Sequence, residues 1–406
     1  MHCGLLGRKL GHSYSPQIHN HLSDYSYTLF EREPEELSEF LKNNELTGLN
    51  VTIPYKKDVI PFLDELSPQA KKMGAVNTIV RRNDGTLIGH NTDYFGFLSM
   101  IGRTGLRLKD KKVLVLGSGG AAATATVVLG ELDANVVVIS RSGVDNYNNL
   151  DKHSDAAVIV NATPVGMYPN VGVCPICLDL FPKLEGVLDM IYNPARTALL
   201  QQAEKRGIVA ENGLWMLVAQ AKESAEWFTG KPISDAVIPQ IHRSLRLEME
   251  NIILVGMPGC GKSTVGKLLA QKMGKEFVDA DVEIEKRQQA KIPAIFETSG
   301  EEGFRRIETA VLSDLGMKSG KVISTGGGCV TREENYPLLH QNGTIIWLQR
   351  QIGKLPTDGR PLSQTGRLEA MYAVRKPLYE RFSDYHVDNN SSVENTVQAI
   401  LSKLEV

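Results

Sequence analysis

The sequence predicts an α/β protein of more than one domain, and three observations support this prediction. At 406 residues the chain is too long for one ordinary hydrophobic core. Two glycine-rich loops, in KKVLVLGSGGAAAT (111–124) and NIILVGMPGCGKST (251–264), each follow a short apolar run and precede a helical pattern. Upstream of both loops, strand-like runs such as LNVTIP alternate with polar helical stretches such as PEELSEFLKN.

The two loops divide the chain into three predicted domains. Residues 1–104 form an α/β unit that the helical residues of about 214–248 complete, and residues 105–213 surround the first loop. Residues 249–406 surround the second loop. The helical pattern of ISDAVIPQIHRSLRLEMEN runs into a charged connector, so we place the last boundary near Glu248. No low-complexity linker separates the halves, which favours close neighbours over beads on a flexible string.

The composition is that of a soluble globular protein, with 42% hydrophobic and 23% charged residues. The net charge of −2 gives no general attraction to nucleic acid or to an anionic membrane, so we expect only small-molecule partners. No apolar run reaches the length of about eighteen residues that a membrane span needs. The first residues, MHCGLLGRKLGHS, lack a signal-peptide pattern. The oligomeric state is not predicted.

The five cysteines are few and scattered, which favours free thiols in a reducing cytoplasm. The pair Cys174-Pro-Ile-Cys177 also fits redox chemistry or half of a zinc site. A zinc site needs a second ligand pair, and none lies nearby in the sequence. The flanking residues are rich in Pro and Gly, unlike the start of a thioredoxin-type helix. Two loop thiols are therefore the favoured interpretation.

The first glycine-rich loop predicts a Rossmann domain that binds a dinucleotide. Its residues Gly117-Ser118-Gly119-Gly120-Ala121 let backbone amides approach a pyrophosphate at a helix N-terminus. An NAD-binding domain usually ends its second strand with Asp or Glu, whereas here VVVIS ends in Ser140-Arg141-Ser142. A guanidinium pairs with a 2′-phosphate and hydroxyls donate to it, so NADP(H) is favoured over NAD. A solvated arginine at a strand end is the alternative.

Three polar stretches in the first hundred residues suggest a substrate site. In Gly11-His-Ser13-Tyr-Ser15-Pro16, Ser15 is the expected N-cap of a helix, and hydroxyls beside that positive helix end suit a carboxylate. A plain capped helix is the alternative there. The other two stretches present Lys56 at a strand end and Asp93 after Asn91-Thr. Lys56 can stabilise and protonate a carbonyl oxygen as hydride arrives at its carbon, with Asp93 as partner. A surface salt bridge is the alternative.

The motifs HSYSP, NVTIPYK, AVNT, NTD, GSGGAA, NATPVGM and NGLWMLVAQA follow one another in the order typical of shikimate dehydrogenases, so residues 1–248 resemble that family. The resemblance implies reduction of 3-dehydroshikimate to shikimate with NADPH. It assigns the substrate carboxylate to Ser13 and Ser15, the catalytic pair to Lys56 and Asp93, and the nicotinamide contacts to Met190 and Gly213. The residues that it places at the substrate hydroxyls are Thr52, Asn77, Asp93, Tyr192 and Gln220. The family's cofactor clamp is commonly Asn-Arg-Ser/Thr, and here Ser140 replaces the Asn while Arg141 is kept.

The second glycine-rich loop matches the P-loop pattern G-x-x-x-x-G-K-[ST] at every fixed position, from Gly256 to Ser263. In such a loop the backbone N–H groups surround the phosphates of ATP, here from Gly259 through Cys260, Gly261 and Lys262 to Ser263 and Thr264. The Lys262 ammonium reaches the β and γ oxygens, and the Ser263 hydroxyl ligates Mg²⁺. IILV before the loop and TVGKLLAQKMG after it supply the required strand and helix.

Later motifs narrow the phosphate acceptor. Asp279 and Asp281 in FVDAD are two residues apart on an expected strand, hence on one side of it. One carboxylate then binds Mg²⁺ through water, and the other takes the proton of the acceptor hydroxyl. The motifs GEEGFRRIE and RKPLY each carry an arginine, Arg305 and Arg375, and two converging arginines suit an anionic acceptor.

The order of P-loop, D-x-D, G-E-x-x-F-R-x-x-E, G-G-G, R-P-L and R-x-P-x-Y resembles shikimate kinase over residues 249–406. The resemblance implies a parallel sheet like that of nucleoside monophosphate kinases, and phosphorylation of shikimate to shikimate 3-phosphate. It makes Lys262 and Asp281 catalytic, gives Mg²⁺ to Ser263 and Asp279, and brings Arg360 onto the phosphates from a mobile lid. The residues that it places at shikimate are Asp281, Arg305, Gly327, Gly328 and Arg375. Adenine contacts stay open.

Rival interpretations remain for each half. The first half could be a quinate/shikimate dehydrogenase that prefers NAD, which Arg141 disfavours. Either half could be a degenerate binding module, although Lys56, Asp93, Lys262 and Asp281 are all retained. The P-loop alone also fits a nucleoside or gluconate kinase. The sequence does not decide whether shikimate passes directly between sites or whether fusion simply fixes the stoichiometry.

Overall fold

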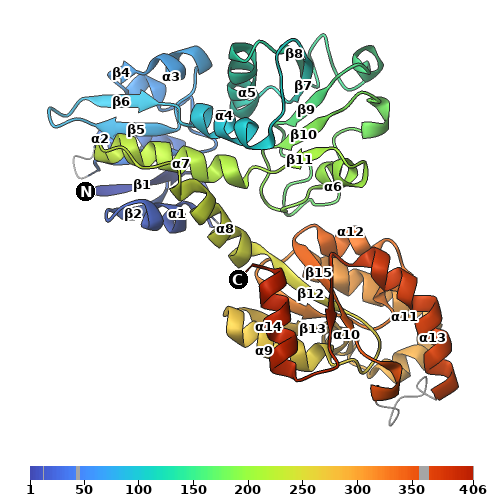
Figure 1. The fold of residues 1–406 in the computed structure, drawn as a ribbon. Coiled ribbons are helices and arrows are strands. Elements are labelled where there is room, and N and C mark those ends of the chain that lie inside the picture. Colours follow the sequence, from blue (N-terminus) through green and yellow to red (C-terminus); the bar gives the residue numbers. More distant parts are fainter. Residues whose placement is uncertain (12, 43–45, 356–364, 406) are drawn as a thin grey trace. The chain divides into compact units, whose positions relative to one another are not determined.

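The computed structural model describes residues 1–11, 13–42, 46–355 and 365–405. The described residues form two compact units, each with its own β-structure (Figure 1). The first unit comprises Met1–Met167, Val173–Tyr192 and Leu199–Leu245, and the second comprises Tyr168–Gly172, Asn193–Ala198 and Arg246–Val406. The division falls inside helix α8 (Val237–Met249).

The first sheet belongs to the N-terminal part of the first unit and has the strand order β2-β1-β3-β5-β6-β4. Its strands are β1 (His2–Gly7), β2 (Ser26–Glu31), β3 (Gly48–Val51), β4 (Glu65–Leu66), β5 (Thr78–Arg81) and β6 (Leu87–His90). It is mixed: β1 runs parallel to β2 and β3, whereas β5 runs antiparallel to β3 and β6. The helices that follow its strands are α1 (Ser15–Leu22), η1 (Pro34–Glu36), α2 (Leu37–Lys42), η2 (Ile60–Phe62) and α3 (Pro68–Met73).

The second sheet of the first unit is entirely parallel, with the order β11-β10-β9-β7-β8. Its strands are β7 (Lys112–Leu116), β8 (Asn135–Ile139), β9 (Val158–Asn161), β10 (Gly186–Asp189) and β11 (Val209–Glu211). Its helices are α4 (Asp93–Thr104), α5 (Gly120–Glu131), η3 (Leu150–His153), η4 (Leu178–Leu180) and α6 (Ala198–Lys205). Residues 113–116 of β7 are fully buried, as a strand covered on both faces requires. The strand order reverses between β7 and β9, which is where doubly wound sheets bind nucleotides.

Helix α7 (Leu214–Thr229) connects the two sheets of the first unit by lying along α4 and packing on α1, β3 and β5 (Figure 1). Gly48 of β3 makes this approach possible, because a Cβ there would lie 2.3 Å from the Phe228 ring. Residues 214–229 are helical, as the sequence predicts, and they pack on elements of the first hundred residues.

The second unit is built on a third sheet, again wholly parallel, with the order β13-β14-β12-β15-β16. Its strands are β12 (Asn251–Val255), β13 (Glu276–Asp279), β14 (Lys321–Ser324), β15 (Gly343–Gln349) and β16 (Tyr385–Asp388). Its helices are α9 (Lys262–Met273), α10 (Ala280–Gln288), α11 (Ile292–Gly316), η5 (Cys329–Thr331), α12 (Asn335–His340), η6 (Ile352–Lys354), α13 (Thr365–Phe382) and α14 (Val393–Lys403). The predicted α/β class and the parallel sheet behind the P-loop are confirmed.

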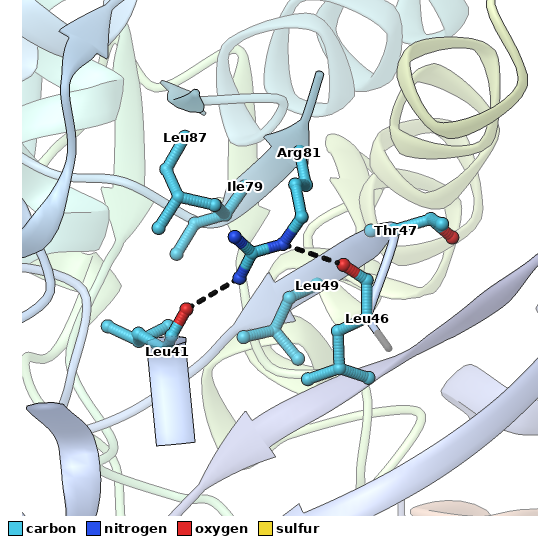
Figure 2. A pocket seen from close by; sticks show the side chains of 8 residues that line it. Leu41, Leu46, Thr47, Leu49, Ile79, Arg81 and Leu87 are labelled. Atoms are coloured by element: carbon cyan, nitrogen blue, oxygen red, sulfur yellow. Dashed lines mark hydrogen bonds between the residues drawn. The ribbon is translucent and has the colours of Figure 1, made fainter. Parts of the chain in front are cut away.

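A cavity of about 20 Å³ lies beside β3 and β5 of the first sheet, and Figure 2 shows its lining. The lining residues are Leu41, Leu46, Thr47, Gly48, Leu49, Ile79, Arg81 and Leu87. The Arg81 guanidinium donates to the carbonyl oxygens of Leu46 (3.1 Å) and Leu41 (2.6 Å). The cavity has room for about one water molecule, and its single cation already holds the surrounding backbone. It therefore carries no chemistry of its own.

Across the helices that the structure describes, none combines the length and the apolar character that crossing a membrane requires.

Candidate active sites

Lys56 and Asp93 meet in the first unit, as the sequence predicts. The Lys56 Nζ lies 2.6 Å from the Asp93 Oδ2, with the two side chains 25% and 13% exposed. Asp93 is the first residue of α4, and Lys56 lies in the turn after β3. The Lys56 carbonyl oxygen accepts from the Val76 N–H at 2.7 Å, which holds this turn in place. Because both side chains are partly shielded, the pair is not the exposed surface salt bridge of the alternative interpretation. It leaves Nζ with further donors for a substrate oxygen.

Asn77 is hydrogen-bonded to Thr92, the residue before Asp93. Its Oδ1 accepts from the Thr92 N–H (2.7 Å), and its Nδ2 donates to the Thr92 Oγ1 (3.0 Å). Thr92 is the N-cap residue of α4, so these bonds couple the position of Asn77 to that of Asp93. The Gln220 Oε1 accepts from the same Thr92 hydroxyl at 3.4 Å. Two predicted substrate residues, Asn77 and Gln220, therefore share one hydrogen-bond network through Thr92.

A buried serine of α7, Ser224, completes the network. Its hydroxyl lies 2.9 Å from Asn50 Nδ2, from Thr78 Oγ1 and from Thr92 Oγ1, and donates to the Gln220 carbonyl oxygen at 2.9 Å. No role was predicted for Ser224, Asn50, Thr78 or Thr92, although the last three lie inside the motifs NVTIPYK, AVNT and NTD. Polar residues within otherwise apolar strands could have indicated Asn50 and Thr78, but not Ser224 or Thr92.

The predicted carboxylate site differs in detail from the expectation. Helix α1 begins at Ser15, but its N-cap is Tyr14 and no side chain caps it, so the prediction that Ser15 is the N-cap is wrong. Ser13 Oγ instead accepts from the Ser15 N–H at 3.2 Å, a local turn that competes with capping. Ser15 is buried and Ser13 half-buried, and both hydroxyl-bearing residues still lie at the helix start.

Two more predicted substrate residues lie beside these elements. Tyr192, in the loop after β10, meets Tyr14 edge-on, with ring centroids 6.2 Å apart. Burial raises the pKa of the Tyr192 hydroxyl, so it stays a neutral donor. Thr52 starts the turn that leads to Lys56, because its carbonyl oxygen accepts from the Tyr55 N–H at 2.9 Å.

The first glycine-rich loop has the geometry of an anion cradle. Gly117 has φ +113°, and a Cβ there would lie 3.0 Å from the Ala162 carbonyl oxygen at the end of β9. Gly119 caps α5, while Ser118 and Gly119 are exposed and Ala121 is in the first turn. A Cβ on Gly119 or Gly120 would meet no protein atom within 4 Å, so the space above the helix start is open. Open space above a helix N-terminus is the geometry in which backbone amides can bind a pyrophosphate.

Met190 and Gly213 touch, as two residues assigned to one nicotinamide should. Gly213 N–H donates to the Ile191 carbonyl oxygen at 3.0 Å, and a Cβ on Gly213 would lie 2.2 Å from the Met190 carbonyl oxygen. Buried Asp189 fixes the same corner by accepting from Asn161 Nδ2 and from the Ile191 N–H, both at 3.0 Å. The corner is thus rigid and has no space for a side chain at position 213.

We predict that Gly213→Ala lowers dehydrogenase kcat/KM by about a hundredfold, because Met190 must move by about 1 Å to admit the methyl group. Gly102→Ala is the matched control: this exposed glycine of α4 has nothing within 4 Å of a Cβ. Steady-state rates with NADPH measure both. A Gly213→Ala enzyme as active as Gly102→Ala would show that the corner does not position the reaction.

The residues of the predicted cofactor clamp, Ser140-Arg141-Ser142, directly follow β8. Arg141 and Ser142 are exposed, and Ser140 is half-buried with its N–H donating to the Asp145 carbonyl oxygen at 3.2 Å. The Asp145 carboxylate is the nearest acidic side chain in sequence, and it pairs with His153 Nε2 at 2.9 Å. Arg141 is thus an exposed cation that directly follows the residue after β8.

Cys174 and Cys177 are free thiols in the loop before η4. Cys174 Sγ donates to the Ile176 carbonyl oxygen at 2.9 Å, and burial raises its pKa. No group of three or more metal-ligating His, Cys, Asp or Glu side chains occurs within the described part of the chain.

The P-loop of the second unit holds Lys262 inside it. Gly256, Gly259 and Gly261 all have positive φ, as the tight path around a phosphate requires. The buried Lys262 Nζ donates to the carbonyl oxygens of Gly256 (2.9 Å) and Met257 (3.1 Å), which leaves one of its three donors. The backbone N–H groups at the start of α9 and this ammonium form a site for a polyanion.

Asp279 and Asp281 lie close together, but not as successive residues on one face of a strand. The strand β13 ends at Asp279, which is the N-cap of α10 and accepts from the Asp281 N–H at 3.1 Å, so Asp281 belongs to the first helical turn. The expectation of a shared strand face is wrong because an N-terminal Asp ends a strand by capping a helix. Ser263 Oγ donates to Asp279 Oδ2 at 2.7 Å. Burial, and next the Asp279 charge, raise the pKa of Asp281 to about 6.

Gly326 lies beside the Asp281 carboxylate, and Gly328 lies against the Arg305 guanidinium. Arg305 Nη1 donates to Glu308 Oε2 at 2.6 Å, both side chains being nearly buried, and its Nε has no hydrogen-bond partner. A Cβ on Gly328 would lie 2.1 Å from Arg305 Nη2, and one on Gly326 would lie 3.0 Å from Asp281 Oδ1. Glycine is required here because the guanidinium rests on the backbone.

Arg375 of α13 reaches the glycine segment from the other side. Its Nη1 donates to the Gly327 carbonyl oxygen at 3.1 Å, and the Tyr379 hydroxyl donates to the same oxygen at 2.5 Å. Lys262, Ser263, Asp279, Asp281, Arg305 and Arg375 thus come together as predicted. Glu308 and Tyr379 were quoted in motifs without a role, and the structure shows that they hold Arg305 and Gly327. Arg360 lies outside the described residues.

Comparison with protein families matches each unit. Residues 5–79 match the family model described as shikimate dehydrogenase substrate binding domain, and residues 258–405 match the model described as shikimate kinase. A shikimate dehydrogenase (NADP(+)) of Clostridium perfringens is 35% identical over 265 residues, which is 60% of this chain and 97% of that protein.

Solved structures agree. The structure of shikimate dehydrogenase 1 from Peptoclostridium difficile matches 61% of this chain and 98% of its own, with 37% identity and a TM-score of 0.56. A shikimate 5-dehydrogenase of Thermus thermophilus in complex with NADP(H) and shikimate matches 60% of this chain and 99% of its own, with 31% identity and a TM-score of 0.55.

Proposed function

This chain belongs to the shikimate dehydrogenase family and carries a shikimate kinase domain, and we propose that it reduces 3-dehydroshikimate to shikimate with NADPH and then phosphorylates shikimate with ATP. One observation carries the proposal: each unit holds a complete set of reacting groups. The first has the shielded Lys56–Asp93 pair, and the second has Lys262 beside Ser263, Asp279 and Asp281. A binding module would need neither set.

In the first unit, the side chains prepare the substrate for hydride addition. NADPH, when bound, supplies the hydride to the carbonyl carbon. Lys56 Nζ donates its proton to the carbonyl oxygen, which becomes the hydroxyl of shikimate. Asp93 holds the ammonium at 2.6 Å and accepts from a neighbouring substrate hydroxyl. Asn77 and Gln220, linked through Thr92, are placed to bind further hydroxyls, and Ser13 and Ser15 to donate to the carboxylate.

The cofactor preference of the first unit is proposed to depend on Arg141. We predict that Arg141→Ala raises the KM for NADP⁺ about ten- to a hundredfold, because a charge-assisted pair with the 2′-phosphate is lost, and leaves the KM for NAD⁺ unchanged. Shikimate oxidation with each cofactor measures this, with Arg107→Ala, another exposed arginine, as control. Equal changes for both cofactors would favour the solvated-arginine alternative.

In the second unit, Asp281 is proposed to take the proton of the acceptor hydroxyl while Lys262 and the P-loop amides stabilise the transferring phosphoryl group. Arg305 and Arg375 pair with the substrate carboxylate, a role that the unpartnered buried Arg305 Nε supports. The Ser263 hydroxyl and the Asp279 carboxylate are hard oxygen donors 2.7 Å apart, which fits Mg²⁺ bound with nucleotide phosphates. Mg²⁺ would neutralise phosphate charge. Arg360 is proposed as a further phosphate contact.

The raised pKa of Asp281 predicts an acid limb for the kinase. Asp281 must be ionised to accept a proton, so kcat/KM for shikimate should be retained above about pH 6 and fall about tenfold per pH unit below it. Rates at subsaturating shikimate between pH 5 and 8 measure this. The residual activity of Asp281→Asn should show no such limb. A wild-type profile that stays flat down to pH 5 would exclude Asp281 as the base.

Two separate assays test the proposed function: NADP⁺-linked oxidation of shikimate, and ATP-dependent phosphorylation of shikimate. Silence of one half in folded protein would support the degenerate binding module for that half. Faster oxidation with NAD⁺ would support the quinate/shikimate alternative, and phosphorylation of a nucleoside or gluconate but not shikimate would support another kinase. A reducing cytoplasm is the proposed location, supported by five free cysteines.

A further inference from the structure

The strands β15 and β16 end beside the P-loop, and each is followed by a polar residue that reaches it. The two strands are parallel, with Gln349 opposite Asp388, so Arg350 and Asn389 leave the sheet at the same edge. Asn389 Nδ2 donates to the Cys260 carbonyl oxygen at 2.5 Å. A Cβ on Gly261 would lie 2.9 Å from this Nδ2 and 3.7 Å from Arg350 Nη1. The Arg350 guanidinium therefore lies next to the N-cap residue of α9.

The two segments after these strands are joined to one another. Gln351 N–H donates to the Asn390 Oδ1 at 2.9 Å, and Lys354 Nζ donates to the Asn390 carbonyl oxygen at 3.2 Å. Asn389 is held from behind, because its Oδ1 accepts from the Thr396 hydroxyl at 2.7 Å. These bonds fix the backbone beside Arg350 and so restrict where its guanidinium can lie.

Within the described part of the chain, the Arg350 guanidinium has no counter-ion. Arg350 Nε is buried and unpartnered, and no described residue pairs with the side chain. A buried donor without an acceptor is costly, and here it stands where the α9 N-terminus and Lys262 already concentrate positive charge. An anion bound at this point would accept from the guanidinium and offset the local positive charge.

We propose that Arg350 is a nucleotide-binding residue that pairs with the polyphosphate of ATP on the Gly261 side of the P-loop. The inference deepens the proposed kinase function and rests on it. It adds a cation that comes from the sheet edge, in addition to Lys262 inside the loop, and the shikimate site keeps its own arginines. Fixed by the β15 and β16 segments, Arg350 sets the affinity for nucleotide and does not take part in the proton transfer.

The test compares Arg350→Ala and Arg350→Lys with Arg287→Ala, whose guanidinium pairs with Asp314 elsewhere in the same unit. Arg350→Ala should raise the KM for ATP and the Ki of inorganic tripolyphosphate by the same factor, about ten- to a hundredfold. The KM for shikimate and kcat at saturating ATP should stay within about threefold, which also shows that the unit is folded. Arg350→Lys should recover part of both losses, since it keeps the charge without the fork.

Three results would overturn the proposal. Unchanged KM for ATP and unchanged tripolyphosphate Ki would mean that Arg350 does not touch the nucleotide. A raised KM for ATP with an unchanged tripolyphosphate Ki and an altered ATP-to-GTP preference would place the contact at the base. A rise in the KM for shikimate alone would place it at the acceptor. Calorimetry of tripolyphosphate binding tests the role of Arg350 separately from the kinase proposal. Wild-type protein that binds tripolyphosphate but does not phosphorylate shikimate would contradict the kinase proposal, and the effect of Arg350→Ala on that binding could still be measured.

Discussion

Replacing Lys56 with methionine is expected to lower kcat for 3-dehydroshikimate reduction by about 10²–10⁴-fold while shikimate phosphorylation continues at the wild-type rate. Methionine keeps the length and the packing of the side chain but removes the ammonium, which is the proposed proton donor to the carbonyl oxygen. The Asp93 carboxylate, 13% exposed, then also loses its cation at 2.6 Å. The measurement is NADPH oxidation at saturating substrate, with ADP formation from shikimate followed in the same preparation.

Lys57→Met is the matched control, because Lys57 is the exposed next residue and forms no part of the network. It should reduce 3-dehydroshikimate as fast as wild type. Asp93→Asn should lower the dehydrogenase activity as Lys56→Met does, because the neutral amide neither holds the Lys56 ammonium nor accepts as strongly from the substrate hydroxyl. A Lys56→Met enzyme that keeps more than about a tenth of the activity would show that another group donates the proton.

Replacing Lys262 with methionine is expected to have the converse effect: kinase kcat falls by about 10²–10³-fold and the dehydrogenase is unaffected. The reason is that the buried Nζ, held at 2.9 and 3.1 Å from two P-loop carbonyl oxygens, is the cation closest to the transferring phosphoryl group. Coupled measurement of ADP formation at saturating ATP and shikimate tests this.

Lys272→Met, an exposed lysine at the other end of the same helix, controls for loss of charge from α9 and should be fully active. Nearly normal phosphorylation by Lys262→Met would contradict the assignment of the P-loop. Simultaneous loss of dehydrogenase activity would show instead that the substitution unfolds the protein.

The arrangement of strands was predictable where apolar runs and turn residues recur together. The runs VLVL and IILV are buried on both faces in β7 and β12, and the glycines after them have the positive φ that their loops need. Lys56 and Asp93 were predicted because a lysine and an aspartate in polar stretches beside turn residues can form an acid–base pair.

Other features depend on contacts that local sequence does not encode. Ser224 joins Asn50 and Thr78 across 174 and 146 residues, so only the folded chain reveals their shared network. The position of Asp281 was missed because Asp279 can either continue a strand or cap a helix, and the cap prevails. No sequence pattern indicated Arg350, because its proposed role depends on a buried Nε that lacks a hydrogen-bond partner in the folded chain.

The two units address chemically consecutive steps on one small carboxylic acid. The proposed carboxylate contacts differ in kind: hydroxyls at the start of α1 in the first unit, and two arginines in the second. Hydroxyls give weaker, neutral recognition, whereas the guanidinium groups bind the carboxylate as an ion pair. We expect the kinase to lose affinity more steeply than the dehydrogenase as salt rises, because ion pairs are screened.

The central claim, that one chain carries two working enzymes for one acid, is tested most directly in a single reaction. Purified protein receives 3-dehydroshikimate, NADPH, ATP and Mg²⁺, and the products are followed by absorbance and by ³¹P NMR. The account predicts one NADPH oxidised and one ADP formed for each 3-dehydroshikimate consumed, with shikimate 3-phosphate as the end product. Two results would contradict it. In the first, NADPH is oxidised and shikimate accumulates, but no phosphorylated product forms. In the second, 3-dehydroshikimate causes no NADPH oxidation, and ADP forms only when shikimate itself is added.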